Sequence, residues 1–267
     1  MKSVRIISFS PTGTTRKVLE GIAAGLDVQT VERLDLTPAS ARTLPRRDLD
    51  DTLALIGAPV YAGRVPIQAA EALRNVKTPG APAILVVVYG NRAYEDALLE
   101  LKTIVAEAGF RPVAAAAFVG EHSFSTQEIP IAWGRPDKED LEKARSFGDR
   151  IHRMLENGRL RADLSALNVP GNLPYRDRMS FLGVTPETAE SVCTHCGECG
   201  EVCPQQAITV GEDGIFTDTG KCILCCACVK TCPEGARRVT DPTVVQIVQK
   251  LAAVCWDRKE PEFFFPK

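Results

Sequence analysis

The chain lacks the features that mark secreted, membrane-spanning or nucleic-acid-binding proteins. Its 267 residues carry a formal net charge of −2, so neither an acidic tail nor a basic face for nucleic acid is expected. The first ten residues turn polar too early for a signal peptide. The longest apolar run, at 83–89, is far shorter than the roughly 18 residues that span a membrane. These absences favour a cytoplasmic protein with no membrane span and no nucleic-acid partner.

Cysteine is also missing from most of the chain. None precedes Cys193, and nine of the ten cysteines lie between Cys193 and Cys232. A secreted disulfide scaffold distributes cysteines over its whole fold, so this clustering argues against disulfides and for metal binding.

The clustered cysteines form two runs of identical spacing. Each run reads CxxCxxCxxxCP, and the members are Cys193, Cys196, Cys199 and Cys203, then Cys222, Cys225, Cys228 and Cys232. The short CxxCxxC loop lets three thiolates reach three irons of one cubane, and the proline redirects the chain after the fourth cysteine. Structural zinc needs four thiolates per site and no third CxxC step, so it fits these runs poorly. The spacing predicts two [4Fe–4S] clusters.

The two runs resemble those of bacterial two-cluster ferredoxins, in which the fourth cysteine of each run binds the other cluster. That resemblance implies one cluster held by Cys193, Cys196, Cys199 and Cys232, and another held by Cys222, Cys225, Cys228 and Cys203. Segments 207–210 and 236–239 follow the runs and could pair as short strands. Cys226 and Cys255 fit no ligand position and are expected to be small buried residues. His195 is expected to face solvent.

Residues 1–158 alternate between strand-like and helix-like segments. Apolar strands are expected at 4–9, 31–36, 52–58, 83–89 and 112–119. Helical segments are expected at 14–26, 95–108 and 138–155. This α/β alternation predicts a parallel sheet with helices on both faces. Residues 27–50 are the least regular part.

The first strand is followed by a loop suited to an anion. It contains Ser10, Pro11, Thr12, Gly13, Thr14 and Thr15 and opens a helix, where backbone N–H groups and hydroxyls can meet a phosphate. It has neither a Walker lysine nor a GxGxxG pattern, which disfavours ATP and a dinucleotide. A turn rich in serine and threonine is also a common helix cap.

Two further loops follow strands at the same carboxyl edge of the predicted sheet, where ligands of doubly wound sheets bind. The first includes Pro59, Val60, Tyr61, Ala62 and Gly63; the second includes Tyr89, Gly90, Asn91, Arg92 and Tyr94. Their glycines permit close backbone approach and their tyrosines could border a flat flavin ring. The alternative is that these are ordinary connecting loops with tyrosines that pack in the core.

With these loops in place, residues 1–158 resemble a short-chain flavodoxin, and the whole chain resembles flavodoxin–ferredoxin fusion proteins. The resemblance is carried by GAPVYAGRVP at 57–66, PGNLPY at 170–175 and the two cysteine runs. It implies a doubly wound, five-stranded parallel sheet in the order 2-1-3-4-5, plus a small α+β two-cluster domain. It also implies FMN, with the phosphate in the 10–15 loop and the ring bordered by 60–63 and 90–94. Pro11 departs from flavodoxins, because it has no N–H for the phosphate.

Charge and composition divide the chain into four predicted parts. Residues 1–158 carry 20 basic and 20 acidic side chains, whereas 190–240 carry 4 basic and 7 acidic ones. The segment 159–189 is predicted to be a connector, with possible apolar anchors at Tyr175, Met179, Phe181 and Leu182. Residues 241–267 form a helix and a tail, and the apolar 261–266 stretch is expected to dock on this chain or on a twin subunit of a homodimer.

Two clusters and a flavin in one chain predict an electron-transfer protein with a redox partner, either a ferredoxin-like donor or a reductase. The alternative is a flavin-dependent reductase of a small molecule or a corrinoid, whose open flavin face could be lined by His122, Ser123 and Phe124. No acid–base pair is identifiable there, so no catalytic residue is assigned. A redox sensor is a third alternative, although no DNA-binding motif supports it.

Overall fold

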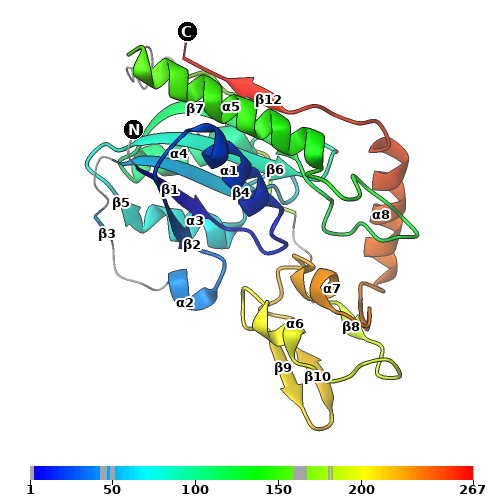
Figure 1. The fold of residues 1–267 in the computed structure, drawn as a ribbon. Coiled ribbons are helices and arrows are strands. Elements are labelled where there is room, and N and C mark those ends of the chain that lie inside the picture. The colour runs from blue at the N-terminus through cyan, green and yellow to red at the C-terminus, as the bar shows by residue number, and fades with distance from the viewer. Residues whose placement is uncertain are drawn as a thin grey trace.

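The computed structural model describes residues 3–42, 47–48, 52–158, 167–179, 181 and 183–266. Its larger part is built on a six-stranded sheet, and the cysteine-rich part lies below this sheet in Figure 1. The spatial order of the strands is β12-β7-β6-β4-β1-β2. Their bounds are β1 (Ser3–Ser8), β2 (Thr30–Asp35), β4 (Leu53–Pro59), β6 (Pro82–Tyr89), β7 (Arg111–Val119) and β12 (Glu262–Phe264).

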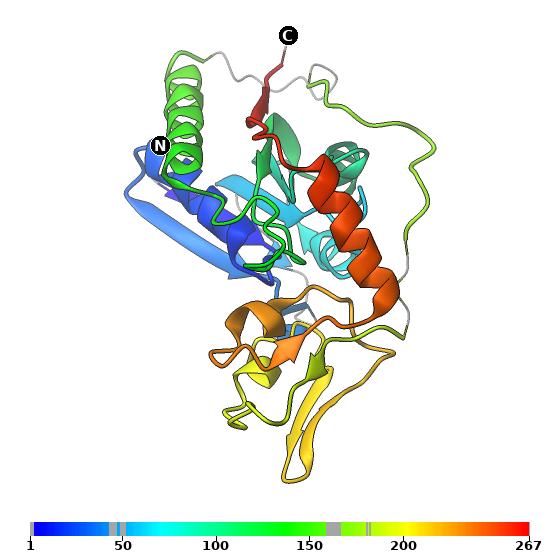
Figure 2. The ribbon, with the colours of Figure 1, turned by 90° about the vertical axis from the view of Figure 1, so that its right-hand side faces the viewer.

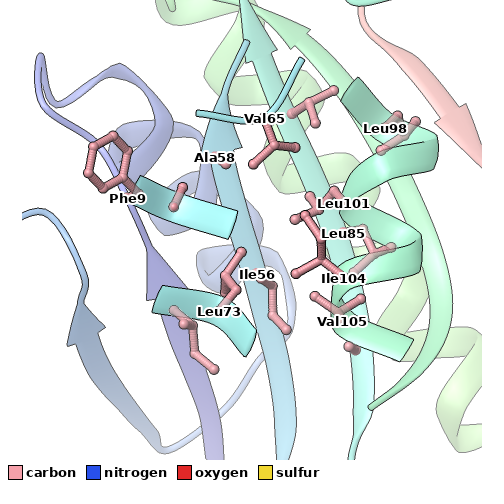
Figure 3. Packing of buried hydrophobic residues seen from close by; sticks show 14 of the residues in the cluster. Phe9, Ile56, Ala58, Val65, Leu73, Leu85, Leu98, Leu101, Ile104 and Val105 are labelled. Carbon is pink, nitrogen blue, oxygen red and sulfur yellow. The ribbon is translucent and has the colours of Figure 1, made fainter. Parts of the chain in front are cut away.

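Helices cover both faces of the sheet. One face packs against α1 (Thr14–Gly25) and α5 (Lys138–Glu156), and the other against α3 (Ile67–Arg74) and α4 (Ala97–Glu107). Figure 3 shows α4 directing Leu98, Leu101 and Ile104 toward Leu85 of β6. The central strands are apolar on both sides because neither side meets water. Among the helices in the described ranges, none is both long and apolar enough to cross a membrane.

The predicted doubly wound order 2-1-3-4-5 is confirmed, with β4, β6 and β7 as the third, fourth and fifth strands. These five strands pair in parallel. Four short elements were not predicted, namely α2 (Ala39–Arg42), the paired β3 (Arg47–Asp48) and β5 (Val76–Lys77), and α3. Their sequences are too short to show a clear period.

The end of the chain returns to the sheet. Helix α8 (Pro242–Val254) is capped by Asp241, whose side chain accepts the N–H groups of Thr243 and Val244 at 3.0 Å. The tail then leads to β12, which adds to the edge strand β7 in antiparallel orientation. The ring of Phe263 stacks on that of Phe147 in α5 at 4.8 Å. The apolar tail therefore docks on this chain, while a homodimer remains a prediction.

The cysteine-rich part contains six short elements. They are β8 (Glu187–Thr188), α6 (Glu198–Glu201), β9 (Ile208–Gly211), β10 (Gly214–Thr217), α7 (Ala227–Thr231) and β11 (Arg237–Arg238). Strand β9 pairs with β10, and β11 pairs with β8. The prediction that 207–210 pairs with 236–239 is therefore wrong. A tight turn ending at Gly214, with φ of 136°, lets β10 fold back directly on β9.

Residues 172–176 of the predicted connector 159–189 lie against α4, whereas β8 near its end pairs with β11. Asp96 accepts the N–H groups of Asn172 and Arg176 at 2.9 and 2.7 Å. The Tyr175 hydroxyl donates to Thr103 at 2.8 Å. Met179 is 55% exposed and so does not anchor the segment as predicted. Residues 159–166 and the predicted anchor Leu182 lie outside the described residues.

Candidate metal centre and its junction with the sheet

The predicted cluster cysteines surround two small cavities. The first, here called the outer site, is lined by Cys193, Cys196, Cys199 and Cys232. The second, the inner site, is lined by Cys203, Cys222, Cys225 and Cys228, and also by Cys226, which belongs to neither run's ligand spacing. Each cavity takes three cysteines from one run and the fourth from the other run. This grouping is the one that the ferredoxin resemblance implies.

Each CxxCxxC loop turns through left-handed residues. In the outer loop His195 and Gly197 have φ of 55° and 87°, and in the inner loop Leu224 and Cys226 have φ of 51° and 60°. Alternating right- and left-handed residues turn backbone N–H groups toward one concave side, which favours an anion. The Leu224 N–H donates to the sulfur of Cys222 at 3.4 Å. The backbone is thus shaped for a negatively charged group inside each loop.

Backbone donors also reach the fourth cysteine of each run. The Ala207 N–H donates to Cys203 Sγ at 3.3 Å, and the Ala236 N–H donates to Cys232 Sγ at 3.2 Å. Each alanine lies four residues after its cysteine, so the two runs repeat the same local geometry. Hydrogen bonds to sulfur are one of the means by which a protein sets the potential of an iron–sulfur cluster.

Burial favours the thiol form of two inner cysteines. It raises the pKa of Cys225 to about 12 and the pKa of Cys228 to about 11. Metal binding requires thiolates, so a bound cation must offset the free-energy cost of burying their negative charge. Four thiolates around each cavity supply the donor set of an all-cysteine cubane, and the residues present fit that group.

The two sites differ in their surroundings. In the inner loop Ile223 packs against the core between the sheet, α3 and α4, and Leu224 is 5% exposed. The corresponding residues of the outer loop, Thr194 and His195, are exposed. Cys196 is exposed as well, whereas its counterpart Cys225 is buried. The outer site therefore faces solvent, and the inner site faces the sheet.

Figure 2 shows the cysteine-rich part lying at one end of the sheet. Side-chain hydrogen bonds join the two parts: Lys230 of α7 donates to Glu121 Oε1 and to the Ser125 carbonyl, both at 2.5 Å. Arg42 Nη2 donates to the Pro204 carbonyl at 2.7 Å. Burial raises the pKa of Tyr61 far above its ordinary value, and negative charge on Cys225 and Cys226 raises it further.

These contacts place the inner site at one edge of the sheet. Tyr61 follows β4 and Glu121 follows β7, so both lie at the carboxyl ends of parallel strands. This is the edge at which doubly wound sheets bind their ligands. The inner site and the predicted flavin loops therefore share one region of the molecule.

The 10–15 loop presents unpaired hydrogen-bond donors at this edge. Gly13, with φ of 81°, donates its N–H to the Ser10 carbonyl at 3.0 Å. The N–H groups of Thr12, Thr14 and Thr15 have no backbone partner among the described residues. The Thr15 hydroxyl is fully buried and also has no hydrogen-bond partner. Free donors at a helix start beside a buried, unpaired hydroxyl fit a bound phosphate.

The 57–66 loop is half-buried and tightly turned. Tyr61 and Arg64 exchange two backbone hydrogen bonds at 3.0 and 3.1 Å. Ala62 and Gly63 between them have φ of 49° and 81°. A Cβ at Gly63 would lie 1.8 Å from Glu95 Oε2, and its left-handed φ also disfavours any residue other than glycine. Pro59 and Val60 precede the turn, and Val60 packs against the core.

The 89–94 loop lies beneath the C-terminal tail. The Asn91 amide donates to the carbonyls of Cys255 and Asp257, both at 2.7 Å. The Tyr94 hydroxyl donates to Glu262 at 2.9 Å, and its ring meets that of Tyr89 edge-on at 5.4 Å. Both tyrosines are buried, whereas Gly90 and Arg92 are half-buried. Tyr94 is 8% exposed, and the flavin contacts predicted for Tyr94, Gly90 and Arg92 stay a prediction.

Comparison with known proteins bears on the C-terminal part. Residues 192–236 match the family model of the 4Fe-4S dicluster domain. The chain joins a flavodoxin-like sheet to a 4Fe-4S dicluster domain. The match confirms the predicted iron–sulfur domain, and the strand order confirms the predicted flavodoxin-like sheet joined to it. The assignment of each ligand remains a prediction.

The dicluster domain is also similar to parts of larger redox proteins. It is 38% identical over 66 residues to hydrogenase-4 component A of Escherichia coli strain K12, covering 24% of this chain and 32% of that protein. It is 40% identical over 63 residues to a tetrathionate reductase subunit of Salmonella typhimurium, covering 22% of this chain and 25% of that protein. The chain thus spans about a third or less of the length of either relative.

The sheet domain has structural neighbours among flavodoxins. A flavodoxin from the domain Archaea is 12% identical, with a TM-score of 0.35, and the match covers 58% of this chain and 99% of that chain. Because this TM-score is low, the fold assignment is based on the strand order of the sheet and not on the similarity to this flavodoxin.

The residues considered for a reductase lie between the sheet and the dicluster domain. His122 packs against Gly90, where a Cβ would come within 2.2 Å of its ring. Burial, together with the nearby Lys230 and Arg92, lowers the pKa of His122 to about 4. Its Nδ1 accepts the Phe124 N–H at 3.1 Å. A neutral imidazole held in this way is a poor proton donor near pH 7, so the reductase alternative gains no support.

Sequence reasoning missed the residues that join the two parts. Arg42 and Lys230 bind partners that lie far away in the chain, so no local pattern marks them. It also missed Arg237, which is 3% exposed and lines both cysteine cavities. A comparison of the two cysteine runs could have singled out Arg237. The first run has the apolar Ile208 at the equivalent position, so the charge at 237 is a difference between the two halves of the repeat.

Proposed function

We propose that the chain is an electron-transfer protein that passes electrons between two [4Fe–4S] clusters and an FMN, to or from a redox partner protein. The single observation that carries this proposal is the position of the inner site. Ile223 of the inner loop packs against the same core as Val60 of a predicted flavin loop, and Lys230 of α7 donates to Glu121, which follows β7. One chain therefore brings both kinds of predicted redox site together.

The proposed cluster ligands are the two sets of cysteines that line the outer and inner sites. The grouping of the eight sulfurs around two cavities supports this assignment. Bound clusters would exchange single electrons, and bound FMN would exchange one or two. The buried Leu224 and Cys225 exclude water from the inner site.

The proposed flavin site uses all three edge loops. Residues 10–15 would hold the phosphate through N–H groups and hydroxyls, with no contribution from the Pro11 nitrogen. Residues 59–63 and 89–94 would border the ring. The unpaired donors around Thr15 support the phosphate site most strongly. Support for 89–94 is weaker, because the C-terminal tail already engages Asn91 and Tyr94.

A redox partner would meet the outer site, where His195 and Cys196 are exposed. The names of the relatives, a component and a subunit, fit a protein that works with others. A reducing, intracellular compartment belongs to the same proposal, because exposed thiolates and clusters do not persist under oxidising conditions.

The first test is anaerobic purification followed by quantitation of iron, sulfide and extracted flavin. We expect about eight irons per chain, as two cubanes require, and about one FMN. In Thr12→Glu a carboxylate beside the loop should repel the phosphate, so flavin should be lost while iron is kept. Thr243→Glu, an exposed threonine at the start of α8, is the matched control and should keep both. If the wild-type protein contained about eight irons but neither retained nor rebound flavin, the proposed flavin site would be wrong. The sheet edge would then serve only as a docking surface.

A further inference from the structure

Arg237 is a buried cation in the middle of the dicluster domain. It begins β11, directly after the second cysteine run, and is 3% exposed. Arginine remains protonated in proteins, so its charge must be balanced by a partner when it is removed from water.

The partners of Arg237 do not balance that charge. Its guanidinium donates to the hydroxyls of Thr188 and Thr217 at 2.7 and 2.9 Å, and one nitrogen lies 3.9 Å from the sulfur of Cys228. No carboxylate in the described part of the chain forms an ion pair with it, and its Nε–H has no hydrogen-bond partner. The counter-charge must therefore come from groups that the cysteines hold.

Arg237 faces both cysteine sites. Among the described residues that line the outer and inner sites, Arg237 alone belongs to both. With four thiolates, an oxidised cubane has a formal charge of about −2 and gains one further negative charge on reduction. One guanidinium is thus positioned to act on the charge of either cluster.

The internal repeat shows that the fold does not require an arginine there. Ile208 lies five residues after Cys203, and Arg237 lies five residues after Cys232. Both residues begin a short strand, β9 and β11 respectively. The same local geometry therefore accepts an apolar side chain in one half and a cation in the other, which separates the role of the charge from that of the fold.

We propose that Arg237 is a shared counter-charge that raises the reduction potential of both clusters. When an external one-electron donor is oxidised and either cluster is reduced, the guanidinium stabilises the added negative charge without gaining or losing a proton. Because it faces both sites, it also lessens the repulsion between the two clusters when both are reduced. This inference rests on the cluster ligands of the proposed function and does not depend on FMN.

The test is a reductive titration of the full chain under anaerobic conditions, followed by visible absorbance and electron paramagnetic resonance. Arg237→Ile copies the residue found in the other half of the repeat. We expect both clusters to become harder to reduce, with each reduction equilibrium weakened at least tenfold, or about 59 mV for one electron. Arg238→Ile is the matched control, because Arg238 is exposed and contacts only the Gly235 carbonyl through its side chain in the described structure.

Two further variants separate charge from hydrogen bonding. Arg237→Lys keeps the charge and should titrate near the wild-type potentials, whereas Arg237→Gln keeps hydrogen-bonding ability and should shift like Arg237→Ile. Unchanged potentials in both neutral variants, or a shift in only one cluster, would overturn the proposal. Loss of iron from both neutral variants would also overturn it, in favour of a purely structural role. Iron quantitation of the wild type separates these outcomes from failure of the cluster assignment itself.

Discussion

The outer and inner cysteine loops have the same ligand spacing and opposite surroundings. Between the first two cysteines the outer loop has Thr194 and His195, which are exposed. The inner loop has Ile223 and Leu224 at these positions, and both pack against apolar clusters. The cysteine spacing thus sets the metal chemistry, while the residues between the ligands decide which site meets solvent and which meets the sheet.

The largest expected effect comes from removing a ligand from either loop. Cys196→Ser and Cys225→Ser should each lose about half of the iron, because each removes a ligand from one of two cubanes. Cys226→Ser should keep its iron, since Cys226 fits no ligand position and its thiol donates to the Leu224 carbonyl at 3.6 Å. Iron and sulfide analysis of the anaerobic proteins measures this.

The control decides whether the ligand register is right. Cys226 is buried beside Cys225, so the two substitutions disturb similar surroundings. If Cys226→Ser lost as much iron as Cys225→Ser, the proposed ligand register of the inner loop would be wrong.

The next effect concerns packing alone. Leu224→Ala should lower the free energy of unfolding by about 2–4 kcal/mol, because it leaves a cavity among Ile131, Val244 and Val248. His195→Ala, at the equivalent outer position, should change it by less than about 0.5 kcal/mol. Urea unfolding of the anaerobic proteins measures both. Equal effects would contradict the difference in burial between the loops.

The smallest effect is a pH dependence at the junction. The pKa of His122 falls from about 6.5 unfolded to about 4 folded, so the unfolded chain binds more protons between these values. Stability should therefore fall as pH drops below about 6.5, by roughly 1.4 kcal/mol for this group at pH 5.5.

A pair of variants isolates this contribution. His122→Gln should remove it from the pH profile of urea unfolding, whereas His195→Gln, in the exposed outer loop, should leave the profile unchanged. A His122→Gln profile parallel to that of the wild type would show that His122 is not held neutral by burial.

Much of the sheet could be predicted because the signals are local. The five parallel strands are apolar runs that need no knowledge of distant residues, and the helices α1, α4 and α5 have their own periodicity. Strand β12 could not be predicted as part of the sheet. It has three residues, and it forms only because β7 offers an unpaired edge beside Phe147.

The flavin loops show where local reasoning stops. Tyr94 reads as a candidate ring contact in a loop after a strand, yet the structure buries it under the tail and bonds it to Glu262. The 10–15 loop is different, because the donors at a helix start follow from the backbone of that loop alone.

By itself the sequence predicted the iron–sulfur chemistry and a parallel sheet, whereas the strand order came from the family resemblance. Cysteine spacing and apolar periodicity act within a few residues of the chain, and their consequences follow from backbone geometry. Only the tertiary structure decided which cysteine site meets the sheet, which residues the tail covers, and that Arg237 lies between the two sites. These features depend on contacts between residues far apart in the chain, and such contacts form only when the whole fold packs together.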